Sequence, residues 1–185
     1  MSSSITLTPQ LSLQFRRATS ADAVALAALA EQTFIETYSE QNEPEQIRVH
    51  CAQNFGLDQQ TAEIANPDYA VILAYQDQDL IGFAQVVKKP APESIDAENA
   101  VALYRYYVKR EWHGKGVAQP LLAEAEKAAL TFGADYLWLG MWEHNARALA
   151  YYQKVGFQHV GWMDYQFGDI IERDYVLLKR LSFAE

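Results

Sequence analysis

The chain has 185 residues, half of them hydrophobic, and carries a formal net charge of −9 at pH 7. This length and composition suit one domain with a full hydrophobic core. The acidic charge argues against non-specific binding to nucleic acid or to anionic membranes, and it would attract a cationic partner. No apolar run approaches the roughly 20 residues that a membrane-spanning helix needs, so we expect neither a nucleic-acid nor a membrane partner.

The first residues and the single cysteine both favour a cytoplasmic protein. Met-Ser-Ser-Ser-Ile lacks the basic and apolar regions of a signal peptide. The lone Cys51 cannot form an internal disulfide, which suits a reducing compartment. We expect a flexible N-terminus over residues 1–10 and a single domain over residues 11–183. The histidines lack metal-ligand spacing with one another or with Cys51, so we expect no metal site.

The first half of the chain predicts a strand, three helices and a pair of strands. Thr19 and Asp22 resemble a capping box at a helix start, and Pro44 suits the first turn of the next helix. The segment from Lys88 to Asn99, with two prolines and three acids, is typical of a loop. The expected ranges are a strand over 11–17, helices over 19–38, from 42 onward and over 58–65, and strands over 69–75 and 80–87.

The second half predicts alternating strands and helices. An apolar strand over 100–108 precedes a helix that begins near Gly116, because Pro120 is tolerated only in a first turn. Apolar residues at helical spacing continue to Phe132. The remaining expected elements are a strand over 135–142, a helix over 145–154, and strands over 157–163 and 174–179. This order predicts an α/β sandwich around a mixed sheet.

The most informative segment is His113-Gly-Lys-Gly-Val-Ala118, which joins the strand over 100–108 to a helix. A glycine-rich turn at a helix start points unpaired backbone N–H groups outward and can seat a phosphate, and Lys115 adds a positive charge. A P-loop would need Ser or Thr after Gly-Lys, and a dinucleotide fingerprint would need a third glycine where Gln119 stands. A tight turn without a ligand remains an alternative.

A second segment makes the pattern specific. His113–Ala118 resembles the acyl-CoA pyrophosphate loop of the GNAT N-acetyltransferases, and Asn145, Ala148, Tyr152 and Gly156-Phe157 resemble the second half of that family's signature. The two blocks have the order and separation of the family. The resemblance implies a GNAT acyl-CoA N-acyltransferase fold, with a mixed sheet of about seven strands flanked by helices, and acetyl-CoA as the co-substrate.

A narrower resemblance concerns one bacterial branch of the family. Trp138–Asn145, Thr33–Tyr38 and Gly168-Asp169 are similar to a branch that includes spermidine/spermine N-acetyltransferases. The chain departs from the family at two positions. His113 stands where the family usually has Gln or Arg, and Ala102 matches a strand position where relatives often carry a glutamate base. A base on that strand is therefore in doubt.

The family resemblance implies roles for individual residues. The pantetheine arm would lie in a splay between the strands over 100–108 and 135–142, with a backbone N–H near Tyr107 and Val108 as the oxyanion donor. Tyr152 would protonate the leaving thiolate. Asn145 would hydrogen-bond pantetheine, or would instead cap a helix. The expected cofactor-binding residues are Tyr106, Tyr107, Val108, His113, Gly114, Lys115, Gly116, Val117, Ala118, Asn145 and Tyr152.

The base and the acceptor site are less sharply defined by the sequence. Glu143 follows the strand over 135–142 and would remove the amine proton directly or through water, although a surface glutamate at a helix start explains it equally well. His144 is the second choice for this role. Glu36 and Tyr38, at the end of the helix over 19–38, would bind the acceptor amine. The alternative there is a solvated acidic helix end.

These residues together predict an N-acetyltransferase that moves acetyl directly from acetyl-CoA to a primary amine, a polyamine or another small molecule. No cysteine is placed for a covalent acyl-enzyme. The alternatives are an acyl-CoA-binding regulator or sensor with little turnover, a protein N-terminal or lysine acetyltransferase, and a nucleotide-binding protein. Homodimers are common for this fold, so a homodimer is compatible with the resemblance.

Overall fold

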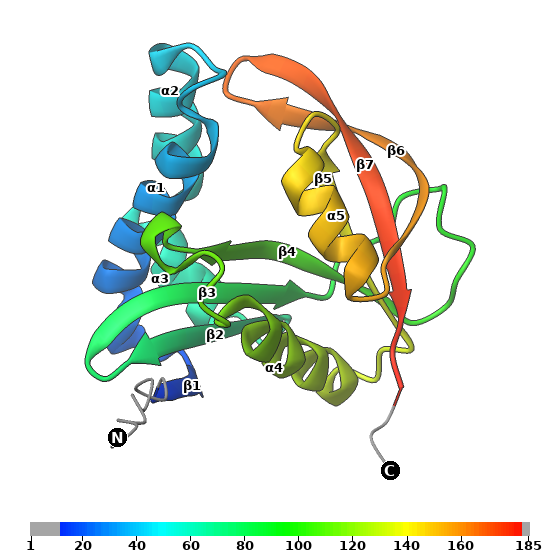
Figure 1. Cartoon of the computed structure of the whole chain (residues 1–185), viewed down its shortest axis with the longest axis horizontal. Helices are drawn as coiled ribbons and strands as arrows, with labels where there is room; N and C mark the ends of the chain where they lie inside the picture. Colours follow the sequence, from blue (N-terminus) through cyan, green and yellow to red (C-terminus); the bar gives the residue numbers. More distant parts are fainter. Residues whose placement is uncertain (1–11, 183–185) are drawn as a thin grey trace, which may run out of the picture.

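A computed structural model of the chain describes residues 12–182 and shows helices on both faces of a twisted sheet (Figure 1). The flexible terminus predicted over residues 1–10 lies outside these described residues, as do the two outermost residues of the predicted domain. No helix within the described residues is long and apolar enough to cross a membrane. The same residues contain no group of three or more histidine, cysteine or acidic side chains that would hold a metal ion.

The predicted elements are all present, in the predicted order. The strands are β1 (Leu13–Arg17), β2 (Tyr69–Gln76), β3 (Asp79–Val87), β4 (Ala100–Val108), β5 (Tyr136–Trp142), β6 (Gln158–Phe167) and β7 (Ile170–Arg180). The helices are α1 (Ala23–Tyr38), α2 (Pro44–Asn54), α3 (Leu57–Ala65), α4 (Ala118–Thr131) and α5 (Ala146–Lys154), with short 3-10 helices at Ser20–Asp22 and Arg110–Trp112.

The seven strands form one sheet in the order β1-β2-β3-β4-β5-β7-β6. Every neighbouring pair is antiparallel except β4 and β5, which are parallel. The predicted α/β fold with a mixed sheet of about seven strands is therefore confirmed. The parallel pair lies near the middle of the sheet, where both of its strands are flanked by helices.

Two hydrophobic clusters attach the helices to opposite faces of the sheet. Leu121 and Ala125 of α4 pack with Ile81 of β3 on one face. Phe34 of α1 and Cys51 of α2 pack with strand residues on the other face. Figure 1 shows α4 and α5 in front of the sheet, and α1 and α2 on the left of the view. Cys51 is 6% exposed, and burial raises the pKa of its thiol to about 11, so it behaves as a small hydrophobic side chain.

β4 and β5 separate shortly after they begin. Their pairing covers only Ala100 to Ala102 on β4 and Tyr136 to Trp138 on β5, although both strands continue. A β-bulge occurs on β4, where Gln85 pairs with Arg105 and the next residue of β3 pairs with Leu103. A bulge bends a strand and increases its twist, so β4 turns away from β5. The predicted splay between these strands is present, and it leaves one backbone edge of each strand without a partner strand.

The structure differs from the predictions at two boundaries. α4 begins at Ala118 rather than near Gly116, because Gly114 and Gly116 have φ values of +74° and +81°, outside the right-handed helical region. β6 and β7 are longer than predicted and meet in a tight hairpin at Gly168 and Asp169. Polar residues interrupt the apolar pattern there, and pairing between the two strands maintains the extended backbone.

Candidate active site

A cavity of about 450 Å³ occupies the splay between β4 and β5. It extends from the glycine-rich turn before α4 to the start of α5, and the end of α1 closes one side. Ten of the eleven residues predicted to bind the cofactor line it; the eleventh, Lys115, is exposed and lies over the Trp112 ring at 5.0 Å. Those ten are Tyr106, Tyr107, Val108, His113, Gly114, Gly116, Val117, Ala118, Asn145 and Tyr152.

The glycine-rich turn has the geometry of an anion-binding loop. Gly114 and Gly116 adopt positive φ, and a Cβ added at either position would meet no atom within 4 Å. The turn therefore requires glycine for its backbone conformation and leaves its outer side open to a ligand. α4 follows directly, so the N–H groups of its first turn and its dipole favour a negative charge at this point. These features fit a diphosphate.

The His113 side chain connects this loop to two other elements through hydrogen bonds at both ring nitrogens. Its Nε2 lies 2.8 Å from the Val108 carbonyl oxygen, and its Nδ1 lies 2.9 Å from Arg147 Nη1. Arg147 can only donate, so Nδ1 accepts and Nε2 carries the proton that is donated to Val108. Burial lowers the pKa of His113, which favours this neutral form. Position 113 therefore joins β4 to the start of α5.

Tyr152 lies on α5, lines the cavity and is 9% exposed. Burial, followed by the neighbouring Tyr151 and Tyr107, raises the pKa of its hydroxyl above the ordinary value, so it stays protonated at neutral pH. The neighbouring tyrosines have structural partners instead. The Tyr106 hydroxyl donates to the Ala118 carbonyl and lies 2.9 Å from the Tyr151 hydroxyl, which ties β4 to α4 and α5.

Asn145 takes the capping position that the sequence offered as its alternative role. Its Oδ1 accepts a hydrogen bond from the Ala148 N–H at 3.0 Å and so begins α5. The residue also lines the cavity, and its Nδ2 group has donors of its own. One side chain can therefore fix the helix and contact a ligand.

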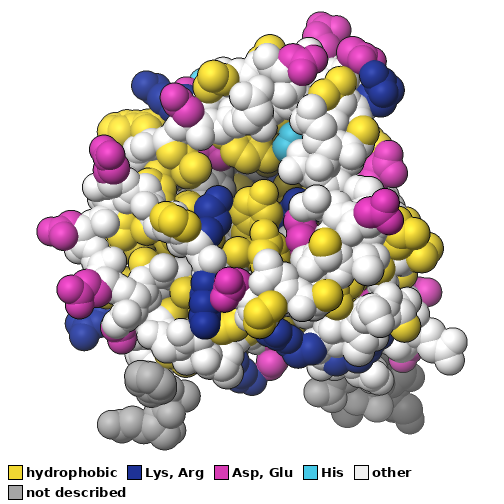
Figure 2. Space-filling view, turned by 180° about the vertical axis from the view of Figure 1, so that it is seen from behind, with side chains coloured by type: hydrophobic (Ala, Val, Ile, Leu, Met, Phe, Trp, Pro, Cys, Tyr) yellow, Lys and Arg dark blue, Asp and Glu magenta, His cyan; other side chains and the backbone are white. Residues whose placement is uncertain are grey.

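A second, smaller cavity of about 70 Å³ lies against the same two strands. It shares Leu103, Tyr104, Arg105, Tyr107 and Gly140 with the larger cavity. The other lining residues come from α2 and the residue after it, from the loop that follows β3, and from strands β4, β5, β6 and β7. The molecule seen from behind is hollowed near its centre, where hydrophobic side chains lie beside basic and acidic ones (Figure 2). The two cavities therefore meet in the splay between β4 and β5.

The sequence model of the family described as "Acetyltransferase (GNAT) family" matches residues 25–157, which include both cavities' β4 and β5 walls. The chain belongs to the GNAT acetyltransferase family. It is an acetyl-CoA-dependent N-acetyltransferase, and acetyl-CoA is its co-substrate. The glycine-rich turn and the splay described above are the parts of this GNAT chain that suit that co-substrate.

Similar proteins carry the same activity in their names. An uncharacterized N-acetyltransferase of Mycobacterium tuberculosis is 29% identical over 160 residues, which cover 86% of this chain and 98% of that protein. A spermidine N(1)-acetyltransferase of Thermoplasma acidophilum is 27% identical over 152 residues, 80% of this chain and 89% of that protein. The crystal structure of PaiA N-acetyltransferase from T. acidophilum in complex with coenzyme A superposes with a TM-score of 0.75 at 24% identity, covering 92% of this chain and 99% of that one.

Besides Lys115, two more of the predicted site residues, Glu143 and Glu36, lie outside both cavities. The Glu143 carboxylate forms an ion pair with Arg173 at 2.9 Å, and hydrogen bonding to Arg173 lowers the pKa of Glu143. The Glu36 carboxylate is half-buried and accepts a hydrogen bond from the backbone N–H of Arg110 at 2.8 Å. Glu143 therefore already has a basic partner, whereas the Glu36 carboxylate is held by a backbone amide. Tyr38, by contrast, lines the larger cavity as predicted.

The sequence analysis did not identify the cations of α5. Arg147 and Lys154 both line the larger cavity. They are seven residues apart, two helical turns, so they project from the same face of α5 as one another. From this spacing, with Tyr151 between the two cations, the sequence could have predicted that α5 presents positive charge to an anionic ligand.

The sequence analysis also did not identify Asp174 and Arg105, the two charged residues of the smaller cavity that are most deeply buried. Arg105 forms an ion pair with Glu63 at 2.6 Å and donates to the side-chain oxygen of Gln85 at 2.8 Å. Asp174 is 5% exposed, and burial raises the pKa of its carboxyl to about 7. The sequence signal for Asp174 was its position two residues before the buried Val176, which places this acid on the inward-facing side of β7.

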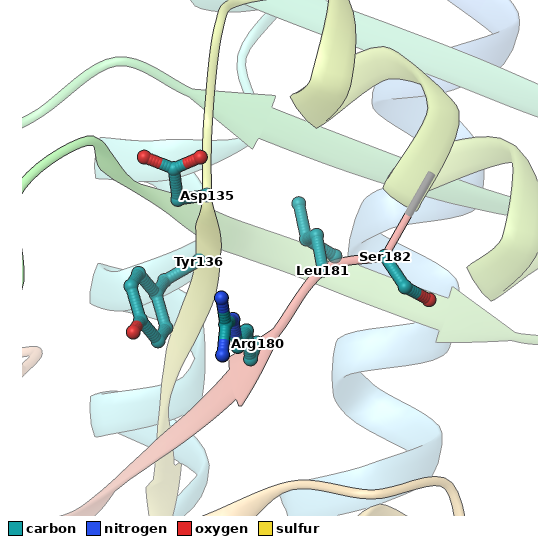
Figure 3. Close-up of a pocket in the computed structure, with 5 residues that line it drawn as sticks. All are labelled: Asp135, Tyr136, Arg180, Leu181 and Ser182. Atoms are coloured by element: carbon teal, nitrogen blue, oxygen red, sulfur yellow. The ribbon is translucent and has the colours of Figure 1, made fainter. Parts of the chain in front are cut away.

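A third hollow, of about 670 Å³, lies at the other end of the sheet. Figure 3 shows its lining residues at the start of β5 and the end of β7: Asp135, Tyr136, Arg180, Leu181 and Ser182. Here the β4–β5 pairing is intact, and the Asp135 carboxylate accepts from Asn99 Nδ2 at 2.9 Å. This hollow shares no lining residue with the two cavities of the splay.

Proposed function

We propose that this enzyme transfers the acetyl group directly to the primary amine of a small molecule, with a polyamine as the first acceptor to test. The observation that supports direct transfer is the meeting of two cavities in one splay, with Tyr107 and Gly140 on the walls of both. A co-substrate in the larger cavity and an amine in the smaller one could then reach each other without a covalent enzyme intermediate. The only cysteine, Cys51, is in neither wall.

The residues of the larger cavity have complementary tasks in this proposal. Backbone N–H groups from Gly114 to Ala118 hold the diphosphate, and Asn145 contacts the pantetheine arm. The unpaired edges of β4 and β5 offer peptide groups to that arm, in the manner of an added strand. Acetyl-CoA supplies an activated acetyl thioester. A backbone N–H near Tyr107 and Val108 polarises its carbonyl, and the Tyr152 hydroxyl protonates the departing sulfur.

The polyamine proposal rests on relatives and charge. Three similar proteins bear names of spermine or spermidine N(1)-acetyltransferases. The chain carries a formal net charge of −9, and Glu36 and Glu40 lie at the end of α1 beside the larger cavity. The Arg110 guanidinium pairs with the Glu40 carboxylate at 3.2 Å, so a polyamine would have to compete with an existing cation at Glu40. The Glu36 carboxylate accepts a hydrogen bond from the backbone N–H of Arg110.

The remaining parts of the proposal concern the setting of the enzyme. A single catalytic domain over residues 11–183, a cytoplasmic location and a homodimer are all compatible with the family. The lone cysteine supports a reducing compartment. Size-exclusion chromatography with light scattering would determine whether the chain is a monomer or a dimer.

A CoA-release assay with a panel of amines tests this function. The panel contains spermidine, spermine, putrescine, aminoglycosides, amino acids and short peptides, and calorimetry measures acetyl-CoA binding in parallel. We expect turnover with the polyamines to exceed that with the peptides. Acetyl-CoA binding without turnover on any amine would instead favour an acyl-CoA sensor, an alternative supported by Ala102 at the strand position where relatives often carry glutamate.

A further inference from the structure

We infer that Asp174 is the catalytic base that takes the proton from the acceptor amine, and that the smaller cavity is the chamber in which that amine lies. This inference rests on the proposed function and assigns a residue and a place to its least defined step. Neither the sequence motifs nor the comparisons with relatives assign a role to Asp174.

The strand register places Asp174 beside the opening between the two cavities. On β7 it pairs with Trp142 of β5 and with Met163 of β6. Gly140 of β5 lies next to it, since a Cβ added to Gly140 would be 3.2 Å from Asp174 Oδ2 and 3.1 Å from Met163 Sδ. Gly140 lines both cavities. The absence of a side chain at position 140 therefore leaves space beside the carboxylate, on the path from one cavity to the other.

Asp174 is also a buried acid without a basic partner. Its side chain forms no hydrogen bond or ion pair with any residue in the described range 12–182, and only burial and the charges of Glu172 and Glu143 influence the pKa of its carboxyl. Glu143, in contrast, is held by Arg173. A base must have a pKa near the working pH and must be free to accept a proton. Asp174, with a pKa of about 7, meets both conditions better than Glu143.

The acidic groups and tyrosines that face Asp174 favour a reaction with a cation. Burial raises the pKa of Asp174 most, and repulsion by Glu172 and Glu143 raises it further. Tyr38, Tyr107 and Tyr165 all have pKa values raised by burial, so they are neutral at pH 7. An ammonium group entering this chamber would relieve the repulsion between the acids, and it would meet uncharged aromatic walls.

Two of the basic groups of the chamber, His50 and Arg105, are neutral or paired with an acid. Burial lowers the pKa of His50 to about 4, so its imidazole is uncharged at pH 7. Arg105 is neutralised by Glu63. Lys89 lies over the Trp138 ring at 5.4 Å, and burial lowers its pKa. His50 Nδ1 and Trp138 Nε1 are buried without a hydrogen-bond partner among residues 12–182, so this wall retains polar atoms that a polar substrate can satisfy.

The proton balance of the step is complete. An ammonium group loses two protons when it becomes an amide. Asp174 takes the first proton and releases it to solvent, which leaves the nitrogen lone pair to form the C–N bond as the C–S bond breaks. The nitrogen then loses its second proton, which replaces the proton that Tyr152 gives to sulfur. One proton is therefore released for each acetyl group transferred.

The experiment compares Asp174→Asn with wild type over pH 5.5 to 10, using the fastest amine of the panel, spermidine in the first instance. The matched control is Asp164→Asn, the same change at an exposed position on β6. Calorimetry measures acetyl-CoA affinity for each variant. Infrared difference spectroscopy without any amine follows the protonated carboxyl band in wild type and in both variants, so Asp174 is titrated independently of turnover.

We expect Asp174→Asn to lower kcat/KM at pH 7 by at least about 100-fold while acetyl-CoA affinity stays within about twofold. Wild-type kcat/KM should bend near pH 7, whereas the variant should continue to rise tenfold per pH unit towards the ordinary pKa of an alkyl amine, roughly 10. The loss should therefore shrink as the pH rises. A carboxyl band that titrates near pH 7 should be absent only from Asp174→Asn.

Three results would overturn the assignment. The first is an Asp174→Asn enzyme that keeps both its rate and the bend near pH 7. The second is a large rise in KM at unchanged kcat, which would show that Asp174 only anchors the ammonium group. The third is the absence of a carboxyl band that titrates near pH 7. Failure of wild type to acetylate any amine would be a different result, because it would reject the proposed function together with the base.

Discussion

The two cavities of the splay are built in different ways. The larger one is formed mainly by consecutive segments, a strand, a glycine-rich turn and a helix start, and the groups proposed to hold the diphosphate belong to the backbone of that turn. The smaller one is assembled from side chains of α2, β4, β5, β6 and β7, which are far apart in the sequence. A site made of backbone groups tolerates a change of side chain, such as His113 where the family usually has Gln or Arg. A site made of side chains depends on each buried charge and its partner. The following predictions test this contrast.

The largest effect should come from the buried ion pair behind the smaller cavity. Arg105→Met would leave the carboxylate of Glu63, which is 4% exposed, buried without its cation. Loss of one partner of a buried pair costs about 3–5 kcal/mol. We expect urea unfolding of Arg105→Met to show a loss of this size.

Two further variants determine whether the loss comes from the unpaired charge. Arg48→Met removes an exposed cation from its pair with Glu45 and should leave the free energy of unfolding almost unchanged, because solvent screens this pair. Arg105→Met combined with Glu63→Met should recover much of the stability, because both charges are then gone. A double variant as unstable as Arg105→Met would mean that packing, and not the charge, is responsible.

The pH dependence of stability should reveal the raised pKa of Asp174. Between pH 4 and 7 the unfolded chain has lost the proton of this carboxyl, while the folded chain, with a pKa of about 7, retains it. The folded state therefore binds more protons, and its stability falls as the pH rises through this window and levels off above it. The total loss is at most about 4 kcal/mol.

Asp174→Asn should remove this loss, so the variant should gain stability relative to wild type as the pH rises from 4.5 to 7.5. Urea unfolding at several pH values measures the difference, with Asp164→Asn as the control that retains the wild-type slope. A constant difference between Asp174→Asn and wild type across this range would contradict a raised pKa. A gain in stability together with a loss of turnover would show that the chamber maintains a destabilising charge for function.

The same contrast explains which features could be predicted from the sequence. The order of elements and the loop from His113 to Ala118 follow from local patterns, and the structure contains them. Asp174 follows Glu172 and Arg173 on β7, so no local pattern sets it apart. Its importance depends on Gly140 and on the bulge in β4, which bring two cavities together. Glu143, the predicted base, has a suitable position in the sequence, but pairing with Arg173 from a distant strand occupies it. Contacts between distant elements were not encoded in any single motif.

On the cofactor side, the residue whose side chain should matter most is Tyr152. Tyr152→Phe removes the hydroxyl that we propose protonates the leaving sulfur, and it keeps the ring in its packing against Phe157. We expect kcat to fall by roughly 100-fold or more, with acetyl-CoA affinity within about twofold by calorimetry. Tyr175→Phe, on β7 and outside both cavities, is the control. Equal rates for Tyr152→Phe and wild type would exclude Tyr152 as the acid.

The smallest predicted effect isolates the backbone of the loop. Gly116 and Gly133 have φ values of +81° and +77°, and a Cβ at either would meet no atom within 4 Å, so alanine adds backbone strain without a clash. This strain is worth about 1–2 kcal/mol. Both alanine variants should lose similar stability in urea. Only Gly116→Ala should weaken acetyl-CoA binding, by roughly tenfold, because only its strain lies in the diphosphate loop. Equal affinities for the two variants would mean that the loop conformation does not govern binding, and the backbone account of the larger cavity would then fail.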